Sequence, residues 1–580
     1  MTETTIKIRR RKVATDVELD ASRPALLNRI YLARNIRQES DLDYALKHLP
    51  PPDALKGMAD AVELLADSLA KQARILVVGD FDADGATSTA VMMKGLAAMG
   101  ALHVSYLVPD RFKFGYGLTP EIVEVAAQQN PGLIITVDNG IASIEGVAAA
   151  KEKGIQVLVT DHHLPGDELP AADAIVNPNQ PGDTFPTKNI AGVGVAFYLL
   201  SALRKQLRNN GWFDKQGIKE PNLAELLDLV TLGTVADVVP LDQVNRTLVK
   251  QGLARINAGR CCPGITALID VAGKQAGNLT ASDLGFFVAP RLNAAGRIED
   301  MSVGIECLLA EDPERANMIA TDLDRLNRER RSIESKMKEQ AMQVLRKLKL
   351  DADLPGGVCI FDESWHQGVI GILASRIKER YHRPVIAFAP AGEESGDGDE
   401  LKGSARSIPG LHIRDALDAI ATHHPGLITR FGGHAMAAGL SLPAASYGEF
   451  SQAFDEEVSR QLDADDLEKT LMTDGELSDV EMNMNTAMLL RNAGPWGQHF
   501  PEPVFEGEFN VVNRRIVGQN HLKMELSSGG TTLDAIMFNI REDFADRVRG
   551  RMTVVYKLDV NEFRGRRSVQ LLVEHMKPAP

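Results

Sequence analysis

Residues 77–88 have the sequence VVGDFDADGATS, and this stretch decides the fold of the chain. The apolar residues 75–78 that lead into it predict a buried strand, and residues 86–99 beyond it are compatible with a helix. Between them lie three carboxylates at alternate positions, namely Asp80, Asp82 and Asp84. Alternating acids at the end of a strand point to the same side and repel one another unless a cation lies between them. Since carboxylate oxygens suit hard divalent cations, the stretch predicts part of a magnesium or manganese site.

Strand-like and helix-like segments alternate on from this stretch. Apolar runs predict strands at residues 103–108, 132–137, 155–160 and 174–178, and helical segments lie between them near residues 86–99, 119–129 and 143–153. Such alternation with continuously apolar strands indicates the α/β class, with a parallel sheet covered by helices on both faces. In such sheets ligands bind beyond the carboxyl ends of the strands.

Two of these strands also end in residue types that bind metals. The strand at 132–137 is followed by Asp138, and the strand at 155–160 by Asp161-His162-His163. Three strands therefore deliver metal-type ligands to one edge of the sheet. This joint occurrence, rather than any single acid, predicts the metal site.

A further acid, Asp237, interrupts the apolar run LLDLVTLGTVADVVPLD at residues 226–242. A buried carboxylate is costly unless it is paired or bound to a metal. Asp228 and Asp242 lie in the same run, so the spacing alone leaves open whether Asp237 is a ligand or a structural acid.

The bulk composition sets wide bounds on function. At 580 residues the chain is too long for one core, and its 44% hydrophobic and 25% charged residues are typical of a soluble globular protein. No apolar stretch predicts a membrane span, and the N-terminus lacks the apolar core of a secretory signal. The four cysteines show no CxxC spacing, which argues against a disulfide framework and a structural zinc and favours a cytoplasmic protein. The net charge of -15 leaves nucleic acid undecided, since net charge does not describe a local groove.

Composition shifts divide the chain into five parts. Helix propensity without Gly or Pro after Pro313 predicts a long, locally basic connecting helix, and β-type alternation in the tail predicts a small barrel resembling an OB fold. The parts are an N-terminal helical segment (1–52), a first α/β domain (53–311), the connecting helix (312–350), a second α/β domain (351–462) and the barrel domain (463–580). Four aromatics of the barrel domain either stack on nucleobases or fill its core, namely Phe505, Phe538, Tyr556 and Phe563.

Three segments outside the acid cluster suit phosphate groups. Residues 289–300 place Arg291 and Arg297 among small residues, and KGSARS at 402–407 carries an arginine between small polar residues. Gly432-Gly433 before a small-residue run resembles the start of an anion-binding helix. Each segment alone is more typical of an ordinary turn, but together they favour a binding face.

These motifs, taken in order, resemble those of one superfamily. GDFDADGATST, TVDNGI, VTDHHLPG and TVADVVPL resemble the four signature motifs of the DHH phosphoesterases, which take their name from the triplet at 161–163. GSARS and GGHAMAAG resemble the companion DHHA1 substrate-binding domain. With the OB-like tail, the resemblance covers nearly the whole chain from about Pro52 and is closest to the exonuclease branch that is specific for single-stranded DNA.

The resemblance implies a 5′→3′ exonuclease that degrades single-stranded DNA to mononucleotides in recombination and repair. It implies two manganese or magnesium ions as cofactors, and a RecQ-type helicase and single-strand-binding protein as partners. No feature demands an oligomer, so a monomer is expected. Superfamily phosphatases have a histidine where this chain has Val78, so Asp80 is either a direct metal ligand or a support behind the ligands.

The ligand set predicts phosphodiester hydrolysis with two metal ions. We expect Asp138 to bridge the ions, Asp82 with Asp80 to complete one, and a second set to complete the other, namely Asp84, His162 and Asp237. His163 is expected to contact the scissile phosphate and stabilise its developing charge, so the catalytic pair is His163 and Asp138.

Recognition of the 5′ end follows from the resemblance to the DHHA1 type. Ser404 and Arg406, with Arg297 and Arg111, are expected to hold a terminal phosphate. Tyr116 and Phe114 lie in a loop where they are able to stack on a base. The glycine pair gives the same face two further candidates, namely Gly433 and His434.

Two other functions compete with this interpretation. A nanoRNase or cyclic-dinucleotide phosphodiesterase resembles the two α/β domains, but such enzymes are typically shorter and lack a tail like the one after Leu462. A catalytically silent strand-binding scaffold would not need the full set of acids and both histidines. We therefore favour the exonuclease.

Overall fold

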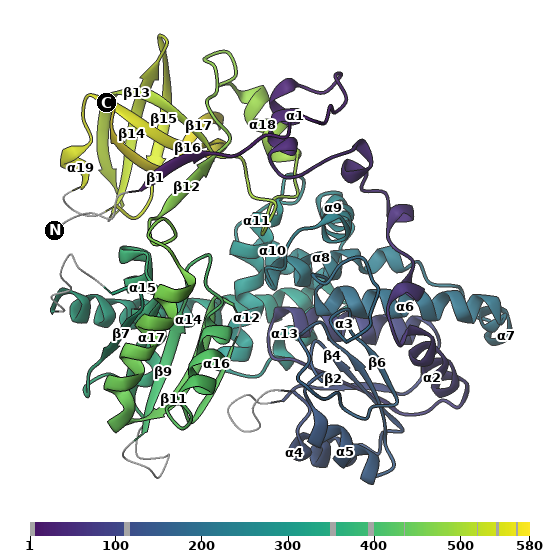
Figure 1. The fold of residues 1–580 in the computed structure, drawn as a ribbon. Helices are drawn as coiled ribbons and strands as arrows, with labels where there is room; N and C mark the ends of the chain where they lie inside the picture. The colour runs from purple at the N-terminus through teal and green to yellow at the C-terminus, as the bar shows by residue number, and fades with distance from the viewer. Residues whose placement is uncertain are drawn as a thin grey trace. The chain divides into compact units, whose positions relative to one another are not determined.

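The computed structural model describes residues 6–109, 117–347, 355–391, 400–433, 435–518, 520–540, 544–563 and 566–579. The chain forms two compact units (Figure 1). The larger unit comprises Arg11–Arg330 and Asp474–Pro580, and the smaller unit comprises Met1–Arg10 and Arg331–Thr473.

The larger unit contains the predicted parallel sheet, with the strand order β3-β2-β4-β5-β6. Its strands are β2 (Ile75–Gly79), β3 (Val104–Leu107), β4 (Leu133–Val137), β5 (Gln156–Thr160) and β6 (Ala174–Val176). Helices α3 (Ala83–Ala98) and α6 (Gly192–Asn209) cover one face, and α4 (Pro120–Ala127) and α5 (Ile144–Glu152) cover the other (Figure 1). Side chains of β2 pack into a hydrophobic core on each face of the sheet. Ile75 and Val77 lie in the core on the α3 and α6 side, and Leu76 and Val78 lie in the core on the α4 and α5 side. The α/β prediction is confirmed.

The register of the strands brings their carboxyl ends to one line. Gly79 at the end of β2 pairs with Val137, and Val137 pairs with Thr160 at the end of β5. The next residue of each strand therefore leaves the sheet at the same edge, which places Asp80, Asp138 and Asp161 side by side.

Helix α3 begins earlier than the sequence predicted, at Ala83 rather than at residue 86. Asp82 has extended backbone angles and caps the helix, since its carboxylate accepts hydrogen bonds from the N–H groups of Asp84 and Gly85. Asp84 therefore lies in the first turn of a helix, and the expectation of three acids alternating along a strand end is wrong. Because the Asp82 carboxylate caps a helix, the chain leaves the strand after Gly79 although the acids alternate as they would along a strand.

The other helices before Pro313 share one hydrophobic core with the α3 and α6 face of the sheet. They are α1 (Ala25–Leu32), α2 (Met58–Ala70), α7 (Trp212–Gln216), α8 (Leu227–Ala236), α9 (Gln243–Asn257), α10 (Pro263–Val271), α11 (Ala281–Asp283), α12 (Ala289–Ile298) and α13 (Ser302–Leu309). A π-helical segment, Leu284–Val288, joins α11 to α12.

The tail of the chain forms the predicted closed barrel, with the strand order β13-β14-β15-β17-β16. Its elements are β13 (Phe505–Val517), β14 (His521–Ser528), β15 (Thr531–Met537), α19 (Phe544–Arg547), β16 (Arg551–Phe563) and β17 (Arg566–Pro578), preceded by α18 (Met484–Asn492). Phe505 and Tyr556 are 0% and 1% exposed, so they fill the barrel core and are unable to stack on bases. Phe538 is 53% exposed, whereas the side chain of Phe563 lies outside the described residues.

The segment before the barrel is anchored against α1 in the larger unit. Arg34 forms an ion pair of 2.8 Å with Asp474, and each side chain is 1% exposed. Tyr31, Trp496 and Phe500 pack their rings beside this pair, with centroids 5.1–6.4 Å apart. Residues far apart in sequence thus share one core.

Helix α14 (Pro313–Lys347) leads from the larger unit into the smaller one and confirms the predicted long helix. The smaller unit has a sheet with the order β10-β11-β9-β8-β7. Its elements are β7 (Val358–Phe361), α15 (Gln367–Tyr381), β8 (Val385–Pro390), β9 (Glu400–Arg406), α16 (Ile413–His423), β10 (Arg430–Gly433), β11 (Ala437–Pro443) and α17 (Tyr447–Gln461).

Two local predictions in the smaller unit differ from the structure. Gly432-Gly433 does not start a helix: β10 and β11 form a hairpin, because Ala438, Leu440 and Leu442 alternate inward along β11 as buried residues. The N-terminal segment is only partly helical, since β1 (Lys7–Arg10) pairs in parallel with β12 (Thr470–Thr473).

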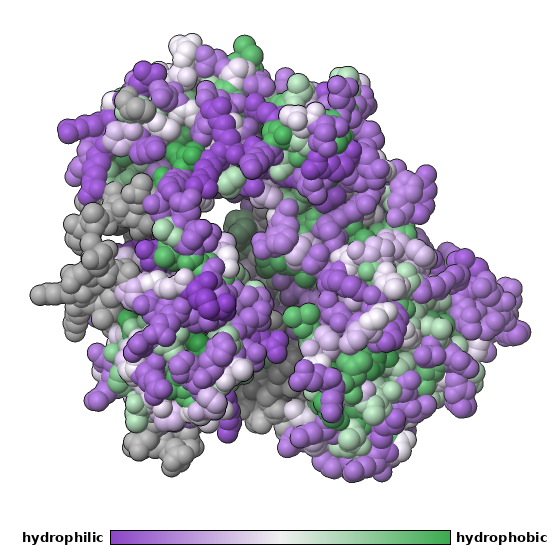
Figure 2. All heavy atoms as spheres, in the orientation of Figure 1, coloured by the Kyte–Doolittle hydropathy of each residue, from purple (hydrophilic) through white to green (hydrophobic). Residues whose placement is uncertain are grey.

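No helix among the described residues is both long and apolar enough to span a membrane. On the face shown in Figure 2, hydrophilic residues predominate and hydrophobic ones occur in small groups between them.

Candidate metal centre

Asp80 and Asp82 are the first acids of the metal centre along the chain, and both lie in the loop between β2 and α3. Asp80 is only 7% exposed, and burial with the nearby charge of Asp82 raises its pKa to about 7. Asp82 caps α3 through Oδ1, 2.8 Å from the N of Asp84 and 3.0 Å from the N of Gly85. The cap fixes the start of the helix and holds the two carboxylates at the edge of the sheet.

Asp84 is buried beneath the N-terminus of α6. Its Oδ2 accepts a hydrogen bond of 2.7 Å from the N–H of Gly192, and its Oδ1 one of 3.0 Å from Val193. These N–H groups stabilise the carboxylate, but burial and the charge of Asp82 outweigh them and raise the pKa of Asp84 to about 7.

Asp138 follows β4 in a left-handed backbone conformation with φ +62° and is 2% exposed. Glycine at 192 makes room for it, because a Cβ there would lie 2.6 Å from Oδ1 of Asp138. Burial and the charges of Asp84 and Asp82 raise the pKa of Asp138 well above its ordinary value. The aspartate is held where its negative charge is least favourable without a cation.

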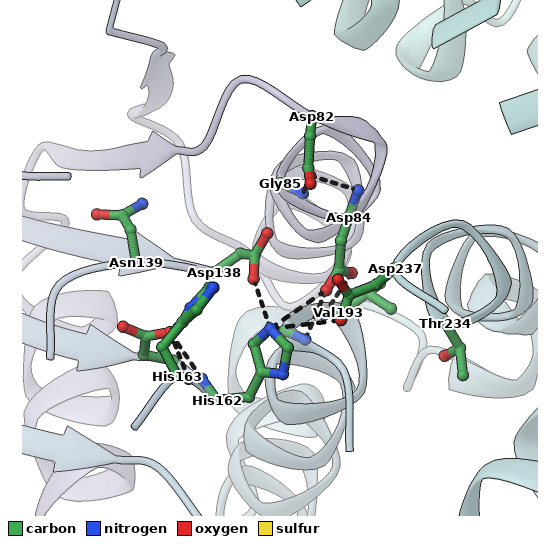
Figure 3. Close-up of polar contacts among 12 residues, drawn as sticks. Asp82, Asp84, Gly85, Asp138, Asn139, His162, His163, Val193, Thr234 and Asp237 are labelled. Atoms are coloured by element: carbon green, nitrogen blue, oxygen red, sulfur yellow. Dashed lines mark hydrogen bonds and ion pairs between the residues drawn. The ribbon is translucent and has the colours of Figure 1, made fainter. Parts of the chain in front are cut away.

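His162 stands among three of the acids (Figure 3). Its Nε2 lies 3.1 Å from Oδ1 of Asp138, 3.5 Å from Oδ2 of Asp237 and 4.0 Å from Oδ2 of Asp84. Asp237 ends α8, and burial with the charges of Asp84 and Asp82 raises its pKa well above its ordinary value.

The structure separates Asp237 from the two acids that share its run. Asp228 accepts hydrogen bonds from the N–H groups of Leu229 and Cys262, and Asp242 caps α9. Both acids are occupied by backbone groups outside the centre. The end of α8 therefore decides which acid reaches it.

His163 is held by Asp161, a residue that the sequence analysis did not assign to the site. Its Nδ1 lies 2.8 Å from Oδ1 of Asp161, which also accepts the N–H groups of His162 and His163. Burial lowers the pKa of His163, but Asp161 and the charges of Asp237 and Asp80 outweigh it and raise that pKa to about 9. Asp161 thus orients the loop and raises the pKa of the imidazole.

Three groups of side chains have ligand atoms within 4.8 Å of one another and are able to hold a metal ion. They are Asp80, Asp82 and Asp138; Asp84, His162 and Asp237; and Asp138, His162 and His163. Asp80, Asp84, Asp138 and Asp237 have pKa values raised by burial and then by one another's charges, so together they form a site that divalent cations would stabilise. The donor set fits Mn²⁺ or Mg²⁺, and the first two groups contain the residues expected for two ions.

Two asparagines that the sequence analysis passed over brace the centre. Asn139 donates to the carbonyl oxygens of Val78 and Val137 and so joins the ends of β2 and β4. Asn293 on α12 accepts the N–H of Ala83 at 2.8 Å. The available signal was that Asn139 lies in the motif TVDNGI and Asn293 in the arginine-containing segment 289–300.

The predicted phosphate-binding residues are more scattered. Ser404 and Arg406 lie on β9, where Nη1 of Arg406 donates to Oγ of Ser404 at 3.0 Å, and Ser404 lines a cavity of about 500 Å³ in the smaller unit. Its other lining residues include Gln367, Lys402, Arg430 and Gly432. Gly433 lies at the end of β10 beside this cavity's lining residues.

In the larger unit, Arg297 is exposed on the last turn of α12. Arg291 is buried and pairs with Asp324 at 2.7 Å, so the pairing of both arginines for phosphate is wrong. Arg111, Phe114, Tyr116 and His434 lie outside the described residues.

Comparison with known proteins gives matches along the whole chain. Residues 74–234 match the DHH family, N-terminal domain, residues 354–460 match the DHHA1 domain, and residues 473–575 match the RecJ OB domain. The single-stranded-DNA-specific exonuclease RecJ of Dickeya dadantii is 56% identical over 573 residues, covering 98% of this chain and 99% of that protein. Its counterpart in Escherichia coli is 52% identical over 577 residues, covering 99% of both.

Solved structures show the same similarity. The crystal structure of RecJ from Thermus thermophilus in complex with Mn²⁺ has a TM-score of 0.74 at 30% identity, covering 96% of this chain and 76% of that one. A structure from the same organism in complex with Mg²⁺ has a TM-score of 0.68 at 29% identity, with 96% and 75% coverage.

Proposed function

The chain belongs to the RecJ family of single-stranded-DNA-specific exonucleases, and from this premise we propose that it hydrolyses single-stranded DNA from the 5′ end and releases mononucleotides. The observation that carries the proposal is the convergence of Asp80, Asp82, Asp84, Asp138, His162 and Asp237 from the loop ends of one sheet and α8. A site with so many buried acids is suited to cations that in turn bind phosphate.

Asp138 lies between the two groups of ligands and is proposed to contact both ions. Asp80 and Asp82 would complete one set, and Asp84, His162 and Asp237 the other. When bound, Mn²⁺ or Mg²⁺ ions supply Lewis-acid polarisation of the scissile phosphate and lower the pKa of the attacking water.

The chain's own residues position this chemistry. The N–H groups of Gly192 and Val193 hold Asp84 in place, and the short loop after β4 holds Asp138. His163, kept positive by Asp161, is proposed to donate a hydrogen bond to a phosphate oxygen and stabilise the charge that develops on it. Asp161 acts through His163 and is a positioning residue.

Polarity is proposed to come from binding of a 5′-terminal phosphate. Arg406 and Ser404 supply adjacent donors on β9 near a cavity that Lys402 and Arg430 also line. In the larger unit, exposed Arg297 is proposed to contact the backbone of the strand. Arg111, Tyr116, Gly433 and His434 remain further candidates for substrate contacts.

The biological setting is proposed from the same family membership. The enzyme would act in recombination and repair in the cytoplasm, as a monomer, on strands that a RecQ-type helicase exposes and a single-strand-binding protein covers. The closed barrel supports a strand-binding module and favours this function over that of a shorter nanoRNase or cyclic-dinucleotide phosphodiesterase.

One assay tests the proposal directly. Oligonucleotides labelled at the 5′ or 3′ end, single- or double-stranded, are incubated with Mn²⁺, Mg²⁺ or a chelator. We expect labelled mononucleotide to appear at once only from the 5′-labelled single strand, and no product with chelator. Release from the 3′ end first, or activity in chelator, would contradict the proposal.

A matched pair of variants tests the site. Asp237→Asn removes a proposed ligand, and Asp242→Asn changes an acid from the same run that caps α9. We expect the first to lose at least a hundredfold in kcat/KM and the second to stay within a few-fold of the wild type. Equal losses would show that Asp237 has only a structural role.

A further inference from the structure

Val238, the residue directly after Asp237, has an unfavourable conformation. Its φ is +60°, in the left-handed region that β-branched residues avoid, and its side chain is 64% exposed. An exposed valine has no packing in the folded chain that would offset this strain. Backbone strain of this kind is concentrated at functional sites.

Phe286 is a second exposed apolar side chain, next to Gly285 in the segment that packs against α8. It lies in the π-helical segment and is 73% exposed, whereas Leu284 and Val288 on either side of it are 0% exposed. A π-helical turn turns one residue away from the face that an α-helix would bury, and such turns are frequent at functional sites. The neighbouring ring of Phe287 is covered by Lys274, whose Nζ lies 3.9 Å from the ring centroid.

Close packing brings the π-helical segment that carries Phe286 against the last turn of α8, which ends at Asp237. The N–H of Val238 donates to the carbonyl oxygen of Val235 at 3.3 Å. A Cβ on Gly285 would lie 3.3 Å from Cγ1 of Val235 and 4.0 Å from the same oxygen. The backbones that carry Val238 and Phe286 therefore meet at the last turn of α8, directly before Asp237.

We propose that Val238 and Phe286 form an apolar rim of the metal centre that packs against a nucleobase of the strand being cleaved. The inference rests on the proposed function, because the occupant is single-stranded DNA. A base is joined to its phosphate through one sugar, so a phosphate held at Asp237 keeps a base within reach of the adjacent rim. Every base has an apolar face, and stacking therefore strengthens binding without selecting a sequence.

The rim is continuous with the proposed catalytic centre. Its occupant is therefore the DNA strand rather than a protein. An unstacked base in single-stranded DNA exposes both faces, whereas a base within a duplex is already stacked on its neighbours. A rim that stacks on the base therefore also favours single strands.

The test compares normal oligonucleotides with others in which the first or the second nucleotide from the 5′ end is abasic. We expect wild-type kcat/KM to be about tenfold lower for at least one abasic substrate. Phe286→Ala should lower kcat/KM about tenfold on the normal strand. On that abasic strand the substitution should lower kcat/KM only slightly. Equal losses on both substrates, or no loss at all, would overturn the proposal.

Val238→Gly gives an independent test, because glycine adopts φ +60° without strain. We expect a melting temperature equal to or above that of the wild type, together with a raised KM for normal strands. An unchanged KM would show that the rim does not touch DNA and that Val238 has another role, such as contact with a protein.

Leu102→Ala is the matched control, since Leu102 is 74% exposed but precedes β3 at the amino-terminal edge of the sheet, opposite the centre. Leu102→Ala should change neither kcat/KM on the normal and abasic strands nor the KM for normal strands. Absence of any 5′-end release by the wild-type enzyme would instead refute the proposed function, so the two failures are distinguishable.

Discussion

At the scale of single residues, the metal centre gathers carboxylates whose negative charges repel one another. Asp80, Asp84, Asp138 and Asp237 all have raised pKa values because they are buried close to one another. The protein tolerates this repulsion in exchange for affinity for cations. Removing one charge should therefore stabilise the metal-free protein while weakening the metal site.

Asp138→Asn tests this exchange, since asparagine adopts the left-handed conformation at φ +62° readily. In chelator we expect the free energy of unfolding to rise, because burial and the neighbouring carboxylates disfavour the ionised form of Asp138 in the folded state. Stabilisation by added Mn²⁺ and nuclease activity should be lost. Denaturant unfolding with and without Mn²⁺ measures both, and a variant that still binds two ions and cleaves DNA would refute the assignment.

The raised pKa values also predict how stability depends on pH in chelator. Asp80 has a folded pKa of about 7 against an ordinary 3.8, so the folded state holds a proton that the unfolded state releases, and stability falls as pH rises towards 7. His163 has a folded pKa of about 9 against 6.5, so its contribution is complete below pH 6.5 and is lost as pH rises through 9. Both groups make the metal-free protein less stable at pH 9 than at pH 6.

Melting temperatures across pH 5–9 check this prediction. Asp80→Asn should flatten the lower part of the curve and His163→Gln the upper part. Saturating Mn²⁺ should reduce the fall, because ions bind the deprotonated carboxylates more tightly as pH rises. A metal-free protein that gains stability between pH 6 and pH 9 would contradict the electrostatic account.

At the scale of elements, the centre depends on how closely α6 approaches the sheet. A Cβ at residue 192 would lie 2.6 Å from Oδ1 and 2.7 Å from Cβ of Asp138, whereas the N–H of Gly192 binds Asp84. The first residue of α6 therefore supports one acid and leaves room for another. Glycine is required there by close approach and not by backbone angle.

Gly192→Ala should displace Asp138 and lower metal affinity and kcat/KM by about ten- to a hundredfold, the usual effect of disturbing groups behind a metal ligand. Metal titration and steady-state kinetics measure the change. The control is Gly448→Ala, which lies in the first turn of α17 and whose Cβ would have no atom within 4 Å. If both variants behave like the wild type, α6 has no part in placing Asp138.

At the scale of the larger unit, one buried ion pair ties the segment before the barrel to α1. The side chains of Arg34 and Asp474 are each 1% exposed, and Asp474 also accepts the N–H of Val504 at 3.0 Å. Breaking a buried pair leaves a charge without its partner in a medium of low polarity. The pair therefore matters for folding of the whole unit.

Asp474→Ala should lower the free energy of unfolding by about 3–5 kcal/mol, as measured by denaturant unfolding. The surface pair Arg37 and Asp16 is the control, since its side chains are 47% and 80% exposed. Asp16→Ala should cost less than about 1 kcal/mol. A loss at Asp474 no greater than at Asp16 would mean that the segment is held by its aromatic contacts alone.

The sequence by itself determined the parallel sheet, the long helix α14, the closed barrel and the edge at which the site lies. These features follow from local chemistry: apolar runs define strands, and parallel strands in register bring Asp80, Asp138 and His162 to one edge. Ser404 and Arg406 were expected at the site from the resemblance alone, and their segment, typical of a turn by its residues, is part of strand β9 in the structure.

Only the tertiary structure decided between residues with the same local pattern. Asp237 reaches the centre, whereas Asp228 and Asp242 bind backbone N–H groups, because the end of α8 and not the spacing directs the side chains. Arg291 forms an ion pair with Asp324 and not with phosphate. Strand β11 pairs with β10 although its small residues suit a helix. In each case a partner distant in sequence supplies the deciding energy, and such partners are set only when the chain has packed.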